Sequence, residues 1–447
     1  MNLQQKFWRF FSSVRLAIFI LCSLAVTSII GTVIPQGQPA AFYVKQYGTK
    51  AAQFMQILDI PEMYSSWWFL ALLGLLAVNL IVCSLDRFPL AWKIITQDNF
   101  AILPGKLLSM KQSLSWELHQ KTASTVSFEQ ICKTLSAAGW RGETRDSNEG
   151  RTFFSQKGKW SRTGVYIVHI SILVIFAGAV TGNVLGFKGS VILPELSTTD
   201  KIYLSGSNDT KELGFSVTCN SFGIEFYANG MPREYESSLT ITEPGKQPYT
   251  QRIEVNKPLT HNGITFYQSS YQGFQDFIVT ISDADKKNTK SFRTPFQKQL
   301  NWDNSGILFG IINAKAMGRR VVESKLWFKA GDAPAVIRWI GAGTPATITI
   351  GEKNYIVKVK QMYATGLQVS KDPGVWIVYL GCGLMILGLY IAFFMSHTRL
   401  WLVETISEKG EKKLILAGNT NKNKAAFDKK FAAVKDTIDA QLQMTNK

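Results

Sequence analysis

The chain has 447 residues, of which 46% are hydrophobic, and its formal net charge is +17 at pH 7. This length, with a mean hydropathy close to zero, excludes both a single soluble domain and a chain made of membrane spans alone. The excess of lysine and arginine would suit nucleic acid in a soluble protein, but here it flanks apolar segments without a nucleic-acid-binding motif, so we expect a lipid bilayer as partner and no nucleic acid.

Four apolar segments are long enough to cross the ~30 Å hydrocarbon core of a bilayer as helices. They comprise residues 16–34, 67–85, 165–185 and 375–394. The first segment follows Lys6, Arg9 and Arg15, as the core of a secretory signal peptide would, but it is longer than such cores and a second span follows soon after it. We therefore interpret it as an uncleaved anchor.

The basic residues beside the spans predict the orientation of the chain, because lysine and arginine collect on the cytoplasmic side of membrane proteins. They precede the first and third spans and follow the second and fourth, so both termini are expected in the cytoplasm. The predicted divisions are a cytoplasmic N-terminus with the first span (1–34), a short extracytoplasmic loop (35–66), the second span (67–86), a cytoplasmic α/β module (87–162), the third span (163–186), an extracytoplasmic β domain (187–373), the fourth span (374–396) and a cytoplasmic tail with an amphipathic helix (397–447).

The second span carries an amide, Asn79, near its cytoplasmic end. Counted at ~1.5 Å per residue from the cytoplasmic ends of their spans, Asn79 and His169 of the third span lie at comparable depth. Asn79 could therefore hydrogen-bond the imidazole and fix its tautomer, as the outer partners of metal-bound histidines do. A plain helix-to-helix hydrogen bond is the alternative.

Between the second and third spans the sequence predicts a small α/β module. Alternating apolar residues predict strands at residues 113–118, 140–145 and 151–156, and Ser127 with Gln130 forms the capping box of a helix that ends at Gly139. His119 lies at a strand end, where we expect it to be solvated.

The third span contains an ionisable group, His169, four residues after its apolar start. A titratable side chain inside a bilayer helix indicates a functional site by default, although a structural hydrogen bond to a neighbouring helix is the alternative. At about 100° per residue, apolar side chains share the helix face of this histidine. They are Val165, Ile172, Leu173, Phe176 and Val180. A single imidazole on such a wall suits a flat, hydrophobic, metal-centred ligand.

From residue 187 to residue 373 the hydrophobic period changes to two, which predicts a large antiparallel β domain with a hairpin turn at Asn229-Gly230. No grouping of catalytic or metal-binding side chains stands out in this segment, so we interpret it as a binding or scaffolding surface. His261 lies in an expected turn and is predicted to be at the surface.

The fourth span has Gly374, Gly381 and Gly388 seven residues apart and nearly on one stripe, which suits close helix packing. His397 beyond it is expected to be an anchor at the membrane interface. The tail ends in an amphipathic helix that should dock on protein or on lipid headgroups. Its apolar face comprises Phe427, Phe431, Val434 and Ile438. The expected fold class is a membrane protein with four transmembrane α-helices, a small cytoplasmic α/β module and a large extracytoplasmic antiparallel all-β domain.

The chain resembles the ResB/CcsB family of cytochrome c biogenesis proteins along nearly its whole length. The similar segments are Gly31-Thr-Val-Ile-Pro-Gln36, Asn79-Leu-Ile-Val-Cys-Ser-Leu-Asp-Arg87, Gly164-Val-Tyr-Ile-Val-His169, Val255-Asn-Lys-Pro-Leu259 and Phe266-Tyr-Gln-Ser-Ser-Tyr271. The resemblance implies a subunit of the System II cytochrome c synthetase in the bacterial inner (cytoplasmic) membrane, with a multi-span partner subunit of the ResC/CcsA type.

The resemblance also implies a function in haem handling. The two-subunit complex would take haem b from the cytoplasmic side, pass it across the membrane and attach it to an exported apocytochrome c; a thioredoxin-like thiol reductant is a further implied partner. His169 occupies the place of an axial haem ligand in that family, and the expected site adds Val165, Ile172, Leu173, Phe176 and, as an outer partner, Asn79. The family's external tryptophan-rich haem site belongs to the partner subunit, so this chain is expected to be non-catalytic alone within a haem lyase complex.

The residues themselves support the need for a partner. A haem iron takes one or two axial ligands, and the spans offer a single histidine, so a second protein ligand would have to come from elsewhere. The alternative function is an assembly scaffold that binds no haem, whose β domain captures apocytochrome or stabilises the partner subunit while His169 has only a structural role.

Overall fold

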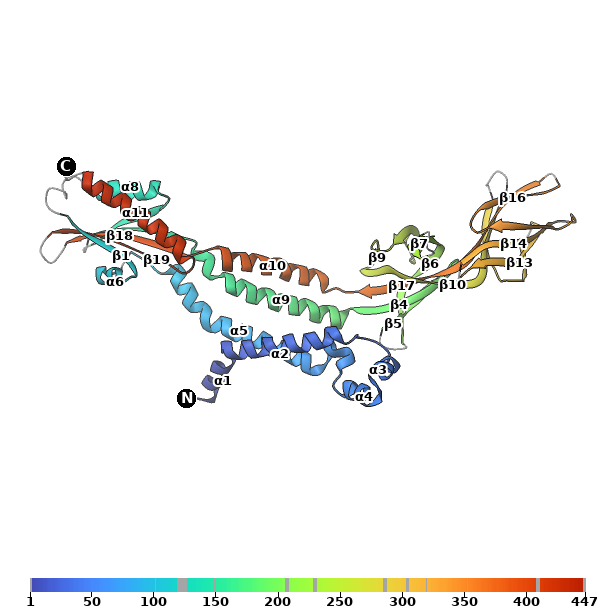
Figure 1. Cartoon of the computed structure of the whole chain (residues 1–447), viewed down its shortest axis with the longest axis horizontal. Helices are drawn as coiled ribbons and strands as arrows, with labels where there is room; N and C mark the ends of the chain where they lie inside the picture. Colours follow the sequence, from blue (N-terminus) through green and yellow to red (C-terminus); the bar gives the residue numbers. More distant parts are fainter. Residues whose placement is uncertain are drawn as a thin grey trace. The chain divides into compact units, whose positions relative to one another are not determined.

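The computed structural model describes residues 2–100, 102–118, 127–147, 150–205, 209–227, 231–283, 288–302, 305–318, 320–351, 353–406 and 411–444. His119 and the expected turn at Asn229-Gly230 lie outside these residues. The chain divides into two compact units, of which the first comprises Met1–Ala179 with Trp376–Lys447 and the second Val180–Val375. Figure 1 shows the elements of both units along the chain.

Four helices are long and apolar enough to cross a membrane, as the sequence predicts. They are α2 (Val14–Val33), α5 (Trp67–Thr96), α9 (Gly164–Leu185) and α10 (Val375–Phe394). Three of them agree closely with the predicted spans, whereas α5 continues to Thr96 through Pro89. The fall in hydropathy at Asp86 therefore marks the end of the apolar segment but not the end of the helix.

Gly381 and Gly388 let α10 approach α9 closely, which confirms the packing expected for these two glycines, whereas Gly374 lies just before the helix. A Cβ atom on Gly381 would lie 3.0 Å from the backbone nitrogen of Ile175, and one on Gly388 would lie 2.9 Å from that of Val168. Larger side chains at these two positions would have to push the helices apart, so the close approach of α9 and α10 depends on glycine.

The segment between α2 and α5 folds back onto the end of α2. Its short helices are α3 (Ala40–Tyr47), α4 (Thr49–Ile57) and the 3₁₀ helix η1 (Ile60–Ser65). The Gln36 side chain accepts a hydrogen bond from the Met63 backbone at 3.0 Å, and the Tyr43 hydroxyl donates to the Pro35 carbonyl at 2.6 Å. A side chain at Gly31 would collide with Met63. The motif from Gly31 to Gln36 thus has a structural role in anchoring this loop.

A five-stranded antiparallel sheet with the order β1-β19-β18-β3-β2 is built from two distant parts of the chain. Its strands are β1 (Gln112–Leu118), β2 (Gly142–Ser147), β3 (Gly150–Lys157), β18 (Thr398–Ile406) and β19 (Lys412–Thr420). Two strands from the tail lie between β1 and β3, so residues 87–162 do not form the self-contained module expected from the sequence. We call this sheet, together with α6 (Pro104–Leu108), α8 (Phe128–Ala137) and α11 (Lys424–Met444), the composite domain.

Both faces of this sheet are covered by helices. The apolar face predicted for the tail helix is confirmed, because all four of its residues are buried with α8 against one face of the sheet. On the opposite face, Leu107 of α6 packs with Trp401 of β18. The tail helix therefore docks on protein, and neighbouring residues of β18 alternate between the two cores.

Replacing Phe431 by alanine is expected to loosen the composite domain, because removing a buried phenyl ring costs roughly 3–5 kcal/mol. Cys132 lies in the same core, and burial raises the pKa of its thiol to about 11, so it reacts slowly while the domain is folded. We expect its alkylation, followed by peptide mass spectrometry, to accelerate about 100-fold or more in Phe431→Ala. The matched variant Lys429→Ala, on the exposed face of α11, should change the rate about twofold at most. Equal rates in both variants would contradict this packing.

The second unit is an antiparallel β structure, which confirms the large antiparallel β region predicted from the alternating residues. A ten-stranded sheet and a four-stranded sheet form it. The strands are β4 (Phe187–Pro194), β5 (Ser197–Leu204), β6 (Thr210–Phe226), β7 (Pro232–Thr242), β8 (Tyr249–Glu254), β9 (Leu259–His261), β10 (Ile264–Asp283), β11 (Thr289–Thr294), β12 (Gln299–Trp302), β13 (Ile307–Met317), β14 (Arg320–Ala330), β15 (Val336–Gly341), β16 (Pro345–Ile350) and β17 (Lys353–Lys371).

Two separate hydrophobic cores lie along this unit, and the long strands β10 and β17 run through both. Phe266 of β10 lies in the first core and Val279 of the same strand lies in the second. Between them the pairing of β10 with β17 shifts register twice, at residues 268–270 and 273–277. Such bulges bend a strand pair, which lets one pair of strands serve two cores.

A buried ion pair lies near these bulges. Glu195 is 1% exposed, and its carboxylate accepts hydrogen bonds from the Lys360 ammonium at 2.5 Å, the Phe222 backbone N–H at 2.7 Å and the Tyr363 backbone N–H at 3.1 Å. The Phe222 ring stacks on Tyr271 with centroids 5.7 Å apart. This one carboxylate therefore connects β6 and β17 at the position where the sheet passes from one core to the next.

Candidate functional site

The histidine of the third span contacts the second span through a serine. His169 Nδ1 lies 2.8 Å from the Ser84 hydroxyl of α5. A similar contact one turn away supports the same pairing of helices, because the Tyr166 ring of α9 packs edge-on against Phe88 of α5 with centroids 5.1 Å apart. The imidazole is thus fixed at one nitrogen by a helix of its own chain.

The second ring nitrogen, Nε2, makes no hydrogen bond within the described part of the chain. In a neutral imidazole one nitrogen carries the proton and the other offers a lone pair. If Nδ1 donates its proton to the Ser84 oxygen, Nε2 presents its lone pair away from α5. That state is the one in which a histidine binds a metal, with an outer hydrogen bond that orients the ring.

Some of the apolar residues predicted to share the histidine face are packed within the chain, and others are exposed. Ile172 and Phe176 pack against the core formed by α2 and α5. Val165 is 50% exposed, Val180 is also exposed, and Leu173 is half-buried. Only part of the predicted wall is therefore available to a ligand or to a second protein.

Asn79 does not contact His169, so the hydrogen bond expected between them is wrong. Its side-chain amide donates to the backbone carbonyls of Phe11 at 2.6 Å and Ser13 at 3.2 Å, at the junction of α1 (Leu3–Phe11) and α2. The alternative, a hydrogen bond between helices, describes its role. The depth counted from the end of the apolar segment misplaced Asn79, because α5 continues beyond that end. Ser84 takes the position beside the imidazole.

The site offers one possible metal ligand, His169, and apolar residues on one side of it. No group of three or more histidine, cysteine, aspartate or glutamate side chains able to hold a metal ion occurs among the described residues. An imidazole with one nitrogen held and one unpaired fits an axial ligand of haem iron, which takes one or two such ligands. The residues therefore fit haem as a bound cargo only if another chain covers its second face.

His397 is buried rather than exposed at a membrane interface, which corrects the anchor role expected for it. The residue is 1% exposed, and its Nδ1 accepts a hydrogen bond from the Arg162 guanidinium at 3.2 Å. Burial, with the neighbouring charges of Arg399 and Arg162, lowers the pKa of His397 to about 4, so the ring is neutral at pH 7. Nε2 lies 3.4 Å from the Gln156 side chain, so both ring nitrogens have partners. His397 is therefore a structural residue.

His261 is also more buried than predicted. Its side chain is 13% exposed, Nε2 lies 2.8 Å from the Glu243 carboxylate, and Nδ1 lies 3.2 Å from the Tyr249 hydroxyl. The Phe215 ring packs edge-on against the imidazole with centroids 4.6 Å apart. Both ring nitrogens of His261 therefore have hydrogen-bonding partners, and its ring packs on an aromatic side chain of another strand. His261 is a structural residue of the β unit.

Comparisons with known proteins find the same group of relatives along most of the chain. A model of the ResB-like family matches residues 14–336 and 311–432. The cytochrome c biogenesis protein CcsB of Microcystis aeruginosa is 29% identical, over 97% of this chain and 95% of its own length. The CcsB protein of Synechococcus sp. (strain JA-2-3B'a(2-13)) is 28% identical, over 94% and 89%. The cytochrome c biogenesis protein Ccs1 of Rhodomonas salina is 26% identical, over 96% of both chains.

Among solved structures, the cytochrome c haem lyase CcmF is 11% identical with a TM-score of 0.21, and the match covers 77% of this chain. The chain spans about half the length of that protein, since the match covers 50% of it. A similarity this low carries no argument about the fold.

Proposed function

The chain belongs to the ResB-like family, and on that premise we propose that it is the subunit of a membrane cytochrome c synthetase complex that binds haem in the membrane, helps export it and supports its covalent attachment to exported apocytochrome c. The relatives named as cytochrome c biogenesis proteins support this role. The chain itself holds haem and does not catalyse the attachment.

The observation that carries the proposal is the geometry of His169. Its Nδ1 lies beside the Ser84 hydroxyl while Nε2 has no partner in the described part of the chain. Haem iron would supply a Lewis-acidic centre for that nitrogen. The residues of this chain would orient the ring and, with Val165 and Leu173, offer an apolar surface beside it.

The same geometry supports a second subunit. Ile172 and Phe176 are already packed within this chain, so only Val165, Leu173 and Val180 of the predicted wall remain for a porphyrin. We propose that a multi-span subunit of the ResC/CcsA type supplies the missing wall and a second axial ligand. Apocytochrome c and a thioredoxin-like reductant that keeps its cysteines reduced complete the set of proposed partners.

The pairing of strands supports the proposed orientation in the bacterial inner membrane. β3 precedes α9 and β18 follows α10, yet the two strands are hydrogen-bonded neighbours. They must therefore lie on one side of a bilayer, and two spans separate them along the chain. With the basic residues beside the spans, this supports a cytoplasmic composite domain, cytoplasmic termini and an extracytoplasmic β unit.

Deleting the chain from its host is expected to abolish covalent haem in c-type cytochromes, measured by haem staining of denaturing gels, and the wild-type chain should restore it. The wild-type complex, purified with its multi-span partner, should show a Soret band. Restored maturation by an intact complex that contains no haem would overturn the haem-binding role and favour the scaffold that binds no haem. Normal maturation without the chain would overturn both roles.

A further inference from the structure

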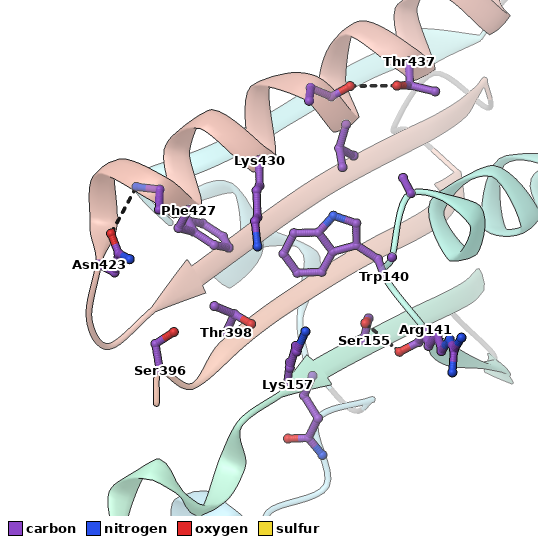
Figure 2. Close-up of a pocket in the computed structure, with 16 residues that line it drawn as sticks. Trp140, Arg141, Ser155, Lys157, Ser396, Thr398, Asn423, Phe427, Lys430 and Thr437 are labelled. Carbon is purple, nitrogen blue, oxygen red and sulfur yellow. Dashed lines mark hydrogen bonds between the residues drawn. The ribbon is translucent and has the colours of Figure 1, made fainter. Parts of the chain in front are cut away.

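A pocket of about 640 Å³ lies in the composite domain between α11 and the sheet. The turn after α8, the end of β3, the start of β18 and the inner side of α11 form its walls, as Figure 2 shows. No step of the proposed haem site uses these residues.

The pocket is cationic. Arg141, Lys157 and Lys430 line it, and none of its lining residues is acidic. Figure 2 shows Lys157 from β3 and Lys430 from α11 with their side-chain nitrogens directed into the pocket from opposite walls. None of the three cations forms an ion pair with another residue of the described ranges. The two lysine charges that converge on this concave surface attract an anion, while the Arg141 side chain extends away from it.

The pocket also has an apolar wall and hydroxyl groups. The indole of Trp140 packs edge-on against the Phe427 ring with centroids 6.1 Å apart, and both side chains border the space. Ser396 and Thr398 add hydroxyl groups that can donate to an anion. The volume far exceeds that of a phosphate ion, so the shape suits an anionic group attached to a larger uncharged body.

The position of the pocket in the chain indicates the source of that anion. Ser396 follows the end of α10 at Phe394 by two residues, and Lys157 precedes the start of α9 at Gly164 by one short 3₁₀ turn, η2 (Lys159–Arg162). The Lys422 ammonium binds the backbone carbonyl of Ala392 in the last turn of α10. The pocket therefore lies where two membrane-crossing helices meet the composite domain, at the level of lipid headgroups.

From these observations we propose that this pocket binds the phosphate headgroup of an anionic phospholipid. Lys157 and Lys430 contact the phosphate, Ser396 and Thr398 donate hydrogen bonds to its oxygens, and Trp140 lies against the glycerol. Basic residues next to a membrane attract anionic lipids. Here the pocket gives such a lipid a defined binding site.

Native mass spectrometry of the purified, delipidated full-length chain with added phosphatidylglycerol tests the site. We expect bound phosphatidylglycerol in preference to phosphatidylcholine, and an apparent affinity weakened about 10-fold or more in the double variant K157Q/K430Q. The matched variant K424Q/K429Q removes the same charge from exposed positions of α11 outside the pocket and should weaken binding about twofold at most. The alkylation rate of Cys132 confirms that each variant is folded.

Equal binding of both lipids, or equal losses in both double variants, would overturn the proposal, because binding would then depend on neither the anion nor the pocket. Two soluble probes separate the sources of phosphate. Inorganic phosphate and glycerophosphoglycerol should bind far more weakly than the intact lipid. If either binds as strongly and loses binding in K157Q/K430Q, the ligand is a soluble phosphate compound and the lipid assignment fails.

Discussion

Replacing His169 by alanine is expected to remove most haem from the complex purified with its multi-span partner. The variant lacks the imidazole whose Nε2 is unpaired in the described structure, so the iron loses an axial ligand. We expect the Soret absorbance per complex to fall about 10-fold or more, and holo-cytochrome c in cells to fall with it. Any haem that remains should show a shifted band, since its ligation has changed.

Two further variants distinguish a ligand from a structural residue. Ser84→Ala keeps the imidazole but loses its orienting hydroxyl, so haem affinity should fall about 10-fold while the Soret absorbance per complex stays above that of His169→Ala. His169→Gly leaves space for free imidazole, which should restore the Soret band when added to the buffer. Unchanged haem content in His169→Ala, or haem loss that imidazole does not reverse in a complex that remains assembled, would show that the ring only stabilises the contact between α5 and α9.

The second large effect is expected from Glu195→Ala in the β unit. The variant removes the partner of Lys360, whose side chain is 28% exposed, and leaves the backbone N–H groups of Phe222 and Tyr363 without their acceptor. Breaking a buried ion pair costs about 3–5 kcal/mol, because a charge stays behind without compensation. We expect this unit to open locally far more often.

Cys219 reports that opening. It is fully buried in the first core of the unit, and burial raises the pKa of its thiol to about 12. Alkylation at Cys219 should accelerate about 100-fold or more in Glu195→Ala. Glu225→Ala is the matched control, because Glu225 pairs with Arg233 at the surface and exposed pairs contribute little. Similar rates in the two variants would mean that the buried carboxylate does not hold the sheet together.

The local features of the fold could be predicted from the sequence. Apolar length predicted the four long helices, and alternating residues predicted the antiparallel strands, because both patterns are set by neighbours a few residues apart. The sheet of the composite domain could not be predicted. In this sheet β3 pairs with β18, although α9, the whole β unit and α10 separate the two strands along the chain. No short-range sequence pattern encodes a pair so far apart.

The candidate site was predicted in part. A histidine in an apolar helix is visible in the sequence, and so is the set of residues on its face. Its partner was not, because the choice between Asn79 and Ser84 depends on how far α5 extends and how it is rotated against α9. The buried pair of Glu195 and Lys360 has no sequence signal, since Glu195 follows β4 directly and meets Lys360 only when β4 and β17 pair in register.

β18 and β19 leave the ribosome after the other three strands of their sheet, yet they fill its middle. Until residue 420 has been translated, β1 and β3 each present an open edge, and open edges recruit other chains. A nascent polypeptide that stalls after α10 would lack the two central strands and would leave the edges of β1 and β3 unpaired. The sheet can close only once β19 has been translated, so the composite domain folds late in biosynthesis.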